Sequence, residues 1–147
     1  MGELSFHKNS TVTTPPQRVL PILQKLKDTY LLWYKYYQTL PKLHRYSLGK
    51  RVDNLFVEVI EAIASASFLA KEEKAPYVRL AIRKTDTLKI LLMILWETKS
   101  LDNKKYSAVS VKIDEIGKML GGWNGQLQKS LEQTRDKQTS PPKAREK

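Results

Sequence analysis

The sequence predicts an all-α protein, an antiparallel up-down-up-down four-helix bundle. Three observations support this fold class. Apolar residues recur at helical spacing through the middle of the chain, strand-like alternation is absent, and the expected connections are only about 3 to 8 residues long. A chain of 147 residues suits one compact domain. We therefore expect a flexible tail over residues 1–16, the bundle over 17–131 and a second flexible tail over 132–147.

The first two helices are expected on either side of Pro41. The first runs from about Arg18 to Leu40, where Pro41 stops it. Its core-facing residues are Leu23, Leu26, Tyr30, Trp33, Tyr34, Tyr37 and Leu40. The second begins near Ser47, whose hydroxyl suits an N-cap, and a polar turn at residues 71–74 closes it. Its core-facing residues are Leu48, Val52, Leu55, Phe56, Val59, Ile60 and Ile63.

The last two helices follow the same pattern. The third is expected to open with Pro76 in its first turn and to run to about Lys99. Its core-facing residues are Ala81, Leu88, Leu91, Leu92 and Leu95. The fourth begins near Asp102 or Asn103, and Gly121-Gly122 indicates a close helix approach or a frayed helix end. Its core-facing residues are Val109, Ile113, Ile116, Leu120, Trp123 and Leu127, in the alternating steps of a bundle seam.

The end of the third helix carries more apolar residues than one core-facing stripe requires. Between Leu88 and Trp96 only Lys89 is not apolar. The residues in excess of the stripe are Ile90, Met93 and Ile94. A helix buried more deeply than its neighbours would explain them, but large exposed apolar patches are typical of contact sites. We therefore predict a subunit interface at these residues.

The charge of the chain indicates a polyanionic partner. Lys and Arg number 26 against 15 Asp and Glu, which gives a formal net charge of +11. A dense cluster surrounds the first connection between helices: Lys35, Lys42, Arg45, Lys50 and Arg51. No acidic residue occurs between Thr29 and Val52 to balance it. Tyr36 and Tyr46 offer rings on which bases can stack, although aromatic residues at helical spacing usually belong to the core.

A second basic pair lies on the third helix. Arg79 and Arg83 are four residues apart and so share one side of the helix. They are either phosphate ligands or part of a solvated surface. No helix-turn-helix recognition surface and no RNA-binding strand motif accompanies them, so contact with phosphates and shape is favoured over readout of sequence.

No constellation of residues typical of an enzyme occurs. The chain has no cysteine, which excludes disulfides and thiolate metal sites. His7 and His44 have no acid or nucleophile at a spacing that would position them, and His44 is expected at the surface. The paired carboxylates that merit consideration as metal ligands are Glu58, Glu61, Asp114 and Glu115. They lack the Glu-x-x-His motif of bundle metal sites, so neither a cofactor nor a metal nor catalysis is predicted.

The apolar segments of the chain are too short for a signal peptide or a membrane span, and this indicates where the protein is located. The first 16 residues lack the apolar stretch of a signal peptide. The longest apolar run, Ile90 to Trp96, is far too short to span a bilayer. We expect a soluble protein of the cytoplasm that does not contact membranes.

Three stretches together resemble one known family. They are LPILQKLKDTYLLWYKYYQTLPK early in the chain, RYSLGKRVDNLFVEVIEAI from Arg45 to Ile63, and DEIGKMLGGW from Asp114 to Trp123. In order and spacing they resemble the accessory variability determinant of diversity-generating retroelements, over about residues 19–125. The wider superfamily includes proteins encoded in intervening sequences of bacterial ribosomal RNA genes, which typically carry Asn-Ile-Ala-Glu-Gly in the second helix. Here that region reads EVIEAIASAS, which favours the retroelement branch.

The resemblance implies a homopentameric barrel of four-helix protomers without catalytic activity. Such a protein binds the retroelement reverse transcriptase and template-repeat RNA, with DNA or an RNA–DNA hybrid as further possible ligands, and supports complementary-DNA synthesis in mutagenic retrohoming. Carried over by position, and with Lys42 added from the basic cluster, the expected nucleic-acid ligands are Lys42, Arg45, Lys50, Arg51, Arg79, Arg83, Lys84 and Lys118. The alternatives are a protein interaction module, or a bundle of the ribosomal intervening-sequence type, with no role in reverse transcription.

Overall fold

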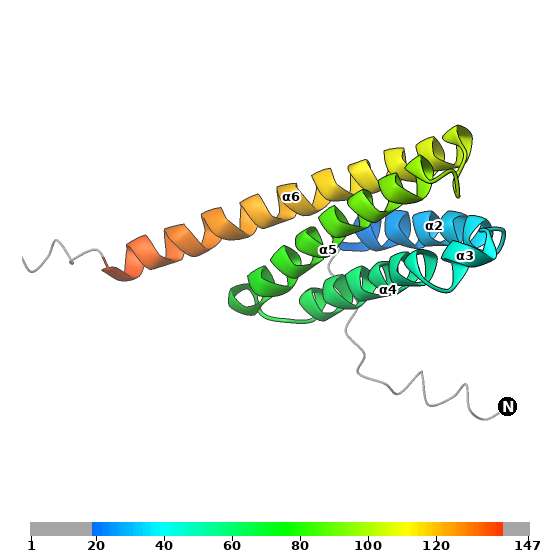
Figure 1. The fold of residues 1–147 in the computed structure, drawn as a ribbon. Coiled ribbons are helices and arrows are strands. Elements are labelled where there is room, and N and C mark those ends of the chain that lie inside the picture. The colour runs from blue at the N-terminus through cyan, green and yellow to red at the C-terminus, as the bar shows by residue number, and fades with distance from the viewer. Residues whose placement is uncertain (1–18, 140–147) are drawn as a thin grey trace, which may run out of the picture.

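The computed structural model describes residues 19–139, which form four long helices and one short one, with no strand in that range. In chain order they are α2 (Val19–Tyr37), α3 (Lys42–Arg45), α4 (Leu48–Ser67), α5 (Lys71–Glu97) and α6 (Asn103–Thr139). The long helices pack in the cyclic order α2, α4, α5, α6, so that each contacts two neighbours. Figure 1 shows them alternating in direction. The predicted all-α four-helix bundle is confirmed.

The core forms where the predicted apolar stripes face one another. All six residues predicted for the α6 stripe are buried: Val109, Ile113, Ile116, Leu120, Trp123 and Leu127. On the opposite side of the core, the Trp33 ring stacks on Phe56 at a centroid distance of 6.0 Å. The Trp33 indole N–H donates to Asp53 Oδ1 at 3.2 Å, so its polar atom is satisfied inside the bundle. Burial raises the pKa of the adjacent Tyr30 to about 12, and Asp53 adds to this effect.

The stripe predicted for α2 is wrong at one residue and incomplete at two. Tyr34 is exposed, whereas Ile22 and Thr29 are buried. The buried line of α2 runs through Ile22, Leu26, Thr29 and Trp33, and Tyr34 lies beside it. Thr29 is tolerated there because its hydroxyl donates to the Lys25 carbonyl at 2.7 Å. The prediction relied on apolar character, so it included Tyr34 and left out Thr29.

The polar segment from Lys71 to Lys74 is the first turn of α5, not the turn that we predicted to close α4. Glu72 and Glu73 lie in that first turn, where acidic side chains stabilise a helix N-terminus. Lys74 Nζ donates to the Ala66 carbonyl near the end of α4 at 2.7 Å. Pro76 is consequently inside α5 and not in its opening turn.

Three further details at helix ends differ from the sequence prediction or refine it. Ser47 directly precedes α4, but its hydroxyl donates to the Leu43 carbonyl and caps no helix N–H. Asp102 does cap α6, because its Oδ1 accepts the Lys105 backbone N–H at 2.8 Å. Gly121 and Gly122 mark neither a close approach nor a helix end, since both lie within α6 beside open space.

Helix α6 continues beyond residue 131, into the segment that we expected to be a tail. It ends only at Thr139, and its residues 132–138 are exposed. This part of α6 extends past the other helices in Figure 1. Glu, Gln, Arg and Lys are good helix formers and make up most of this segment, so the polar composition that predicted a tail equally suits an exposed helix. The expected tails over 1–16 and 140–147, and the expected start at Arg18, lie outside the described residues.

Candidate nucleic-acid interface

The connection between α2 and α4 is a tightly packed structure that displays lysines. The Arg45 guanidinium donates to the Leu40 carbonyl through Nε at 3.2 Å and Nη2 at 2.9 Å, which holds α3 against the end of α2. Gly49 is buried, and a Cβ built on it would lie 2.6 Å from Leu40 Cδ1 and 2.8 Å from the His44 carbonyl oxygen. This compact turn leaves Lys42 and Lys50 exposed.

The α5–α6 connection lies against this first connection at the same end of the bundle (Figure 1). His44 Nδ1 and Ser100 Oγ are hydrogen-bonded at 2.5 Å. Lys105 Nζ donates to Thr39 Oγ1 at 3.4 Å and lies 5.6 Å from the centre of the Tyr36 ring. We call the combined cations the basic end: Lys35, Lys42, Arg45, Lys50, Arg51, Lys99, Lys104 and Lys105.

Much of the positive charge of the basic end is left without a partner. Lys42, Lys50, Lys99 and Lys104 are exposed, and none forms an ion pair with any residue between 19 and 139. The Tyr46 ring is 70% exposed beside the Arg45 guanidinium, 6.0 Å from it. Such a surface attracts phosphate and offers an aromatic ring next to the charges.

Two of the predicted ligands pair with Glu58 of α4: Lys84 reaches it from α5, and Arg51 lies on the same helix. Glu58 Oε1 accepts from Lys84 Nζ at 2.7 Å, and Glu58 Oε2 pairs with Arg51 at 3.3 Å. The hydrogen bond from Lys84 is the main cause that keeps the pKa of Glu58 below its usual value. Arg51 and Lys84 are therefore less available for phosphate than the unpaired lysines.

The remaining predicted ligands lie away from the basic end. Arg79 and Arg83 are exposed on the N-terminal half of α5 and form no ion pair within the described part of the chain. Lys118 is exposed on α6 and lines a groove of about 340 Å³ together with Asp86 and Lys89 of α5. The structure thus divides the predicted nucleic-acid ligands into two groups.

The apolar residues predicted as a subunit interface lie on the outer side of α5. Ile90 is 53% exposed, Ile94 is 36% exposed, and Met93 is half-buried. We predicted a subunit interface because these apolar residues would be exposed in a single chain, and Ile90 and Ile94 are exposed in the structure. The interface itself stays a prediction.

Three of the four carboxylates considered as metal ligands, Glu58, Asp114 and Glu115, pair with lysines, whereas Glu61 forms no ion pair between residues 19 and 139. Lys89 Nζ lies 3.6 Å from Asp114, and Lys25 Nζ lies 2.8 Å from Glu115. The hydrogen bond from Lys25 is the main cause that lowers the pKa of Glu115. No cluster of three or more His, Asp or Glu side chains suited to a metal occurs between residues 19 and 139, and no helix in that range is long and apolar enough to cross a bilayer.

Sequence reasoning missed three of the eight cations of the basic end and misplaced one histidine. Lys99, Lys104 and Lys105 were not selected, although the first and third connections of an up-down bundle necessarily lie at the same end. That topological rule was the signal that would have found them. His44, expected at the surface, is half-buried because it hydrogen-bonds across to Ser100.

Comparison with known proteins agrees with this architecture. A family model described as bAvd-like matches residues 20–127. A crystal structure from Bacteroides thetaiotaomicron, of a protein with unknown function from the S23 ribosomal protein family, is similar in fold with a TM-score of 0.68. That similarity has 14% sequence identity and covers 74% of this chain and 99% of the other. No curated protein matches the chain.

Proposed function

The chain belongs to the bAvd-like family, and on that premise we propose that it is a non-catalytic, nucleic-acid-binding accessory protein of a diversity-generating retroelement. The observation that carries the proposal is the convergence of two connections at the basic end, where exposed lysines have no acidic partner among residues 19–139. Exposed, unpaired cations at this density are typical of surfaces that neutralise phosphates.

The proposed partners follow from the family resemblance and the charge. Template-repeat RNA would contact the basic end, with Arg79 and Arg83 as a second contact along α5. Reverse transcriptase would bind the same assembly, so that the accessory protein holds template and polymerase together during complementary-DNA synthesis. A homopentamer would present five chains of charge +11 to one RNA, which makes binding steep in salt concentration.

The test compares charge reversals at the two surfaces. The variants Lys42→Glu with Lys50→Glu, and Arg79→Glu with Arg83→Glu, each change the net charge equally. A control pair, Lys27→Glu with Lys129→Glu, makes the same change at exposed cations outside both surfaces. Retardation of a structured RNA by the purified protein is measured in a salt series, with helicity followed by circular dichroism.

We expect the first pair to weaken RNA binding most and to lower the slope of affinity against salt, because fewer counterions are released. The control pair should bind nearly as well as the unaltered chain. Equal losses in all three variants would show that net charge alone drives binding. No retardation by the unaltered protein would exclude the proposal and favour the alternative, a protein interaction module whose basic surface meets an acidic surface on a partner.

A further inference from the structure

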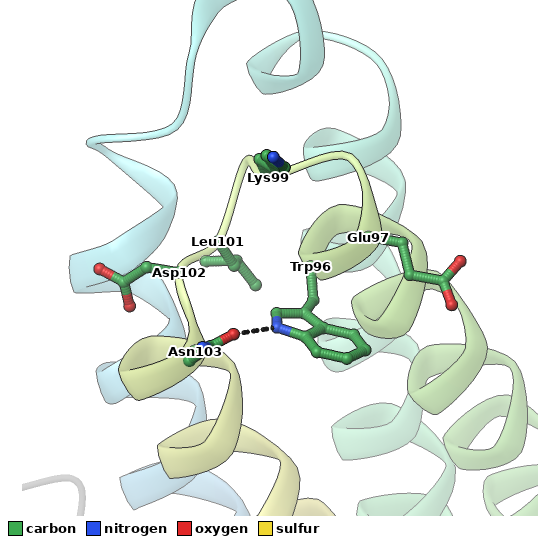
Figure 2. A pocket seen from close by; sticks show the side chains of 6 residues that line it. All are labelled: Trp96, Glu97, Lys99, Leu101, Asp102 and Asn103. Carbon is green, nitrogen blue, oxygen red and sulfur yellow. Dashed lines mark hydrogen bonds between the residues drawn. The ribbon is translucent and has the colours of Figure 1, made fainter.

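A pocket of about 530 Å³ lies in the α5–α6 connection, within the basic end. It is lined by Trp96, Glu97, Lys99, Leu101, Asp102 and Asn103, which Figure 2 shows around the turn. This volume is within the range of small-molecule sites and exceeds what one planar base requires. None of the functional residues predicted from the sequence lies in this pocket, so it is a feature that the structure adds.

The Trp96 indole is the main recognition surface of the pocket. One ring face stacks on Tyr106, with centroids 5.0 Å apart and planes 11° apart. The indole N–H donates to Asn103 Oδ1 at 2.6 Å, as drawn in Figure 2. The side chain is nevertheless 36% exposed, whereas Trp33 and Trp123 are buried. Trp96 is therefore a ring held in a fixed position with its only donor already used, and it can recognise a ligand only by stacking.

The charges around the pocket separate it into two zones. Asp102 and Glu97 lie in the lining and disfavour a phosphate inside it. Lys99 belongs to the same lining but lies at the tip of the turn in Figure 2, apart from both acids, and the exposed Lys104 directly follows Asn103, so a phosphate is favoured beside these two cations. A ligand that fits both zones has a neutral planar group attached to a flexible anionic backbone.

The backbone conformation of Lys99 also supports a role for a cation beside Trp96. Its φ is 67°, the left-handed conformation that usually belongs to glycine at a helix C-terminus. The Ser100 N–H donates to the Leu95 carbonyl at 2.8 Å and the Lys99 N–H to the Trp96 carbonyl at 2.9 Å, as this terminating motif requires. A lysine at this position keeps a cation beside Trp96 where the backbone alone would favour glycine.

From these features we infer that the Trp96 pocket binds an unpaired nucleobase of single-stranded nucleic acid, whose flanking phosphates contact Lys99 and its neighbouring lysines. The inference rests on the proposed nucleic-acid binding and makes it specific. Bases inside a duplex are already stacked on both faces, so only an unpaired base can enter the pocket. The basic end would thus distinguish looped or single-stranded template from helical segments.

Tryptophan fluorescence provides the test, since Trp96 is the one exposed indole among the three in the chain. The probes are an oligoadenylate of about 12 nucleotides, within the length that one site contacts, and the same strand annealed to its complement. The variants are Trp96→Phe, which keeps a stacking ring, and Trp96→Ala, which removes it. Leu31→Ala, at an exposed apolar side chain of α2, is the control. Thermal melts establish that each variant is folded.

The single strand should quench the fluorescence of the unaltered protein, and the duplex should bind without quenching it. Trp96→Phe should bind the single strand within about threefold of the unaltered affinity but show no quenching, while Trp96→Ala should lose about tenfold or more. Leu31→Ala should behave as the unaltered chain. The Phe variant keeps the test decisive if the Ala variant fails to fold.

Three results would overturn the inference. Single-strand binding with no quenching, and with affinity unaffected in the variants, would leave the proposed nucleic-acid binding intact but remove the pocket from it. A change in Trp96 emission on concentrating the protein without RNA, and none on adding RNA, would assign the pocket to a contact between protein chains. Failure of both probes to bind would reject the proposed function and the pocket together.

Discussion

Single residues at the basic end show how the backbone constrains what the side chains can present. Lysines 42 and 50 are displayed because Gly49, in the first turn of α4, packs closely against Leu40 and His44, and Arg45 closes the turn beneath them. At the other connection a lysine occupies a backbone conformation that favours glycine. Gly49 is thus the residue that packing requires, whereas Lys99 is a residue that its backbone conformation disfavours.

Gly49 should be indispensable to the first connection. In Gly49→Ala the new Cβ would lie 2.6 Å from Leu40 Cδ1 and 2.8 Å from a backbone oxygen of His44, which cannot move independently. We expect a loss of about 1 to 3 kcal/mol in the free energy of unfolding, measured by urea denaturation. Gly121→Ala is the control, because open space surrounds that residue and alanine favours an exposed helix by about 0.5 to 1 kcal/mol. Equal effects at the two glycines would contradict the packing at Gly49.

Replacing Lys99 by glycine should stabilise the fold but weaken the binding of nucleic acid. Because its φ is 67°, Lys99→Gly should relieve about 1 kcal/mol of backbone strain and raise the free energy of unfolding. The same variant removes a cation from the margin of the Trp96 pocket and should weaken binding of single-stranded RNA. Urea denaturation and RNA titration of one preparation check both effects. A variant that is more stable and binds unchanged would leave Lys99 without a role in recognition.

Pairs of helices are held together by ion pairs as well as by the core. The best connected is Glu58 of α4, which pairs with Lys84 of α5 and with Arg51 of its own helix. Lys25 and Glu115 connect α2 with α6 in the same way, and Lys89 and Asp114 connect α5 with α6. Lys25, Arg51, Lys84 and Lys89 are therefore engaged in holding the fold and are less available to a ligand.

Glu58 should stabilise the fold only while it is ionised. Its pKa is lowered in the folded chain, chiefly by the hydrogen bond from Lys84. A lowered pKa means stabilisation that is fully present above the unfolded value, 4.5, and that is lost as the pH falls through the folded value. Glu58→Gln should therefore cost about 0.5 to 1 kcal/mol at neutral pH, where a partly exposed pair contributes modestly.

Urea denaturation at neutral and acid pH checks the role of Glu58. The difference between the variant and the unaltered chain should shrink below pH 4.5, as Glu58 becomes protonated in both folded and unfolded states. Glu61→Gln serves as the control, since Glu61 is exposed on the same helix and forms no ion pair with any residue from 19 to 139. A pH-independent difference at Glu58 would mean that its charge is not what stabilises the bundle.

The sequence was sufficient to predict the helices but not all of their ends. The α6 stripe was predicted completely because six apolar residues at steps of three and four leave one way to face a core. The start of α5 was wrong because polar residues suit a turn and a first helical turn equally, and only the Lys74 contact with Ala66 distinguishes them. The Trp96 pocket could not be predicted at all, since it depends on Tyr106 and Asn103 of the next helix.

At the scale of the whole molecule, the basic end and the predicted subunit contact lie on different parts of the bundle. The basic end gathers two connections, while the exposed apolar residues Ile90 and Ile94 lie along the side of α5. An assembly that buries the α5 surfaces of neighbouring chains would leave each basic end free. Phosphate attraction would then add up over the chains of the assembly without adding new contacts within any one of them.

The assembly proposed from the family resemblance makes a direct prediction for solution mass. A homopentamer would have a mass of about 85 kDa, five times the 17.0 kDa of one chain, by light scattering. Ile90→Asp with Ile94→Asp should reduce that mass while preserving the helical content of each chain, because both side chains are exposed in the single chain. Leu31→Asp, an equally exposed apolar residue on α2, should leave the mass unchanged.

RNA affinity should fall together with the mass, since each separated chain keeps its basic end but loses the other copies. A 17.0 kDa particle in the unaltered protein would exclude the assembly, and a loss of mass at Leu31 alone would move the interface to α2.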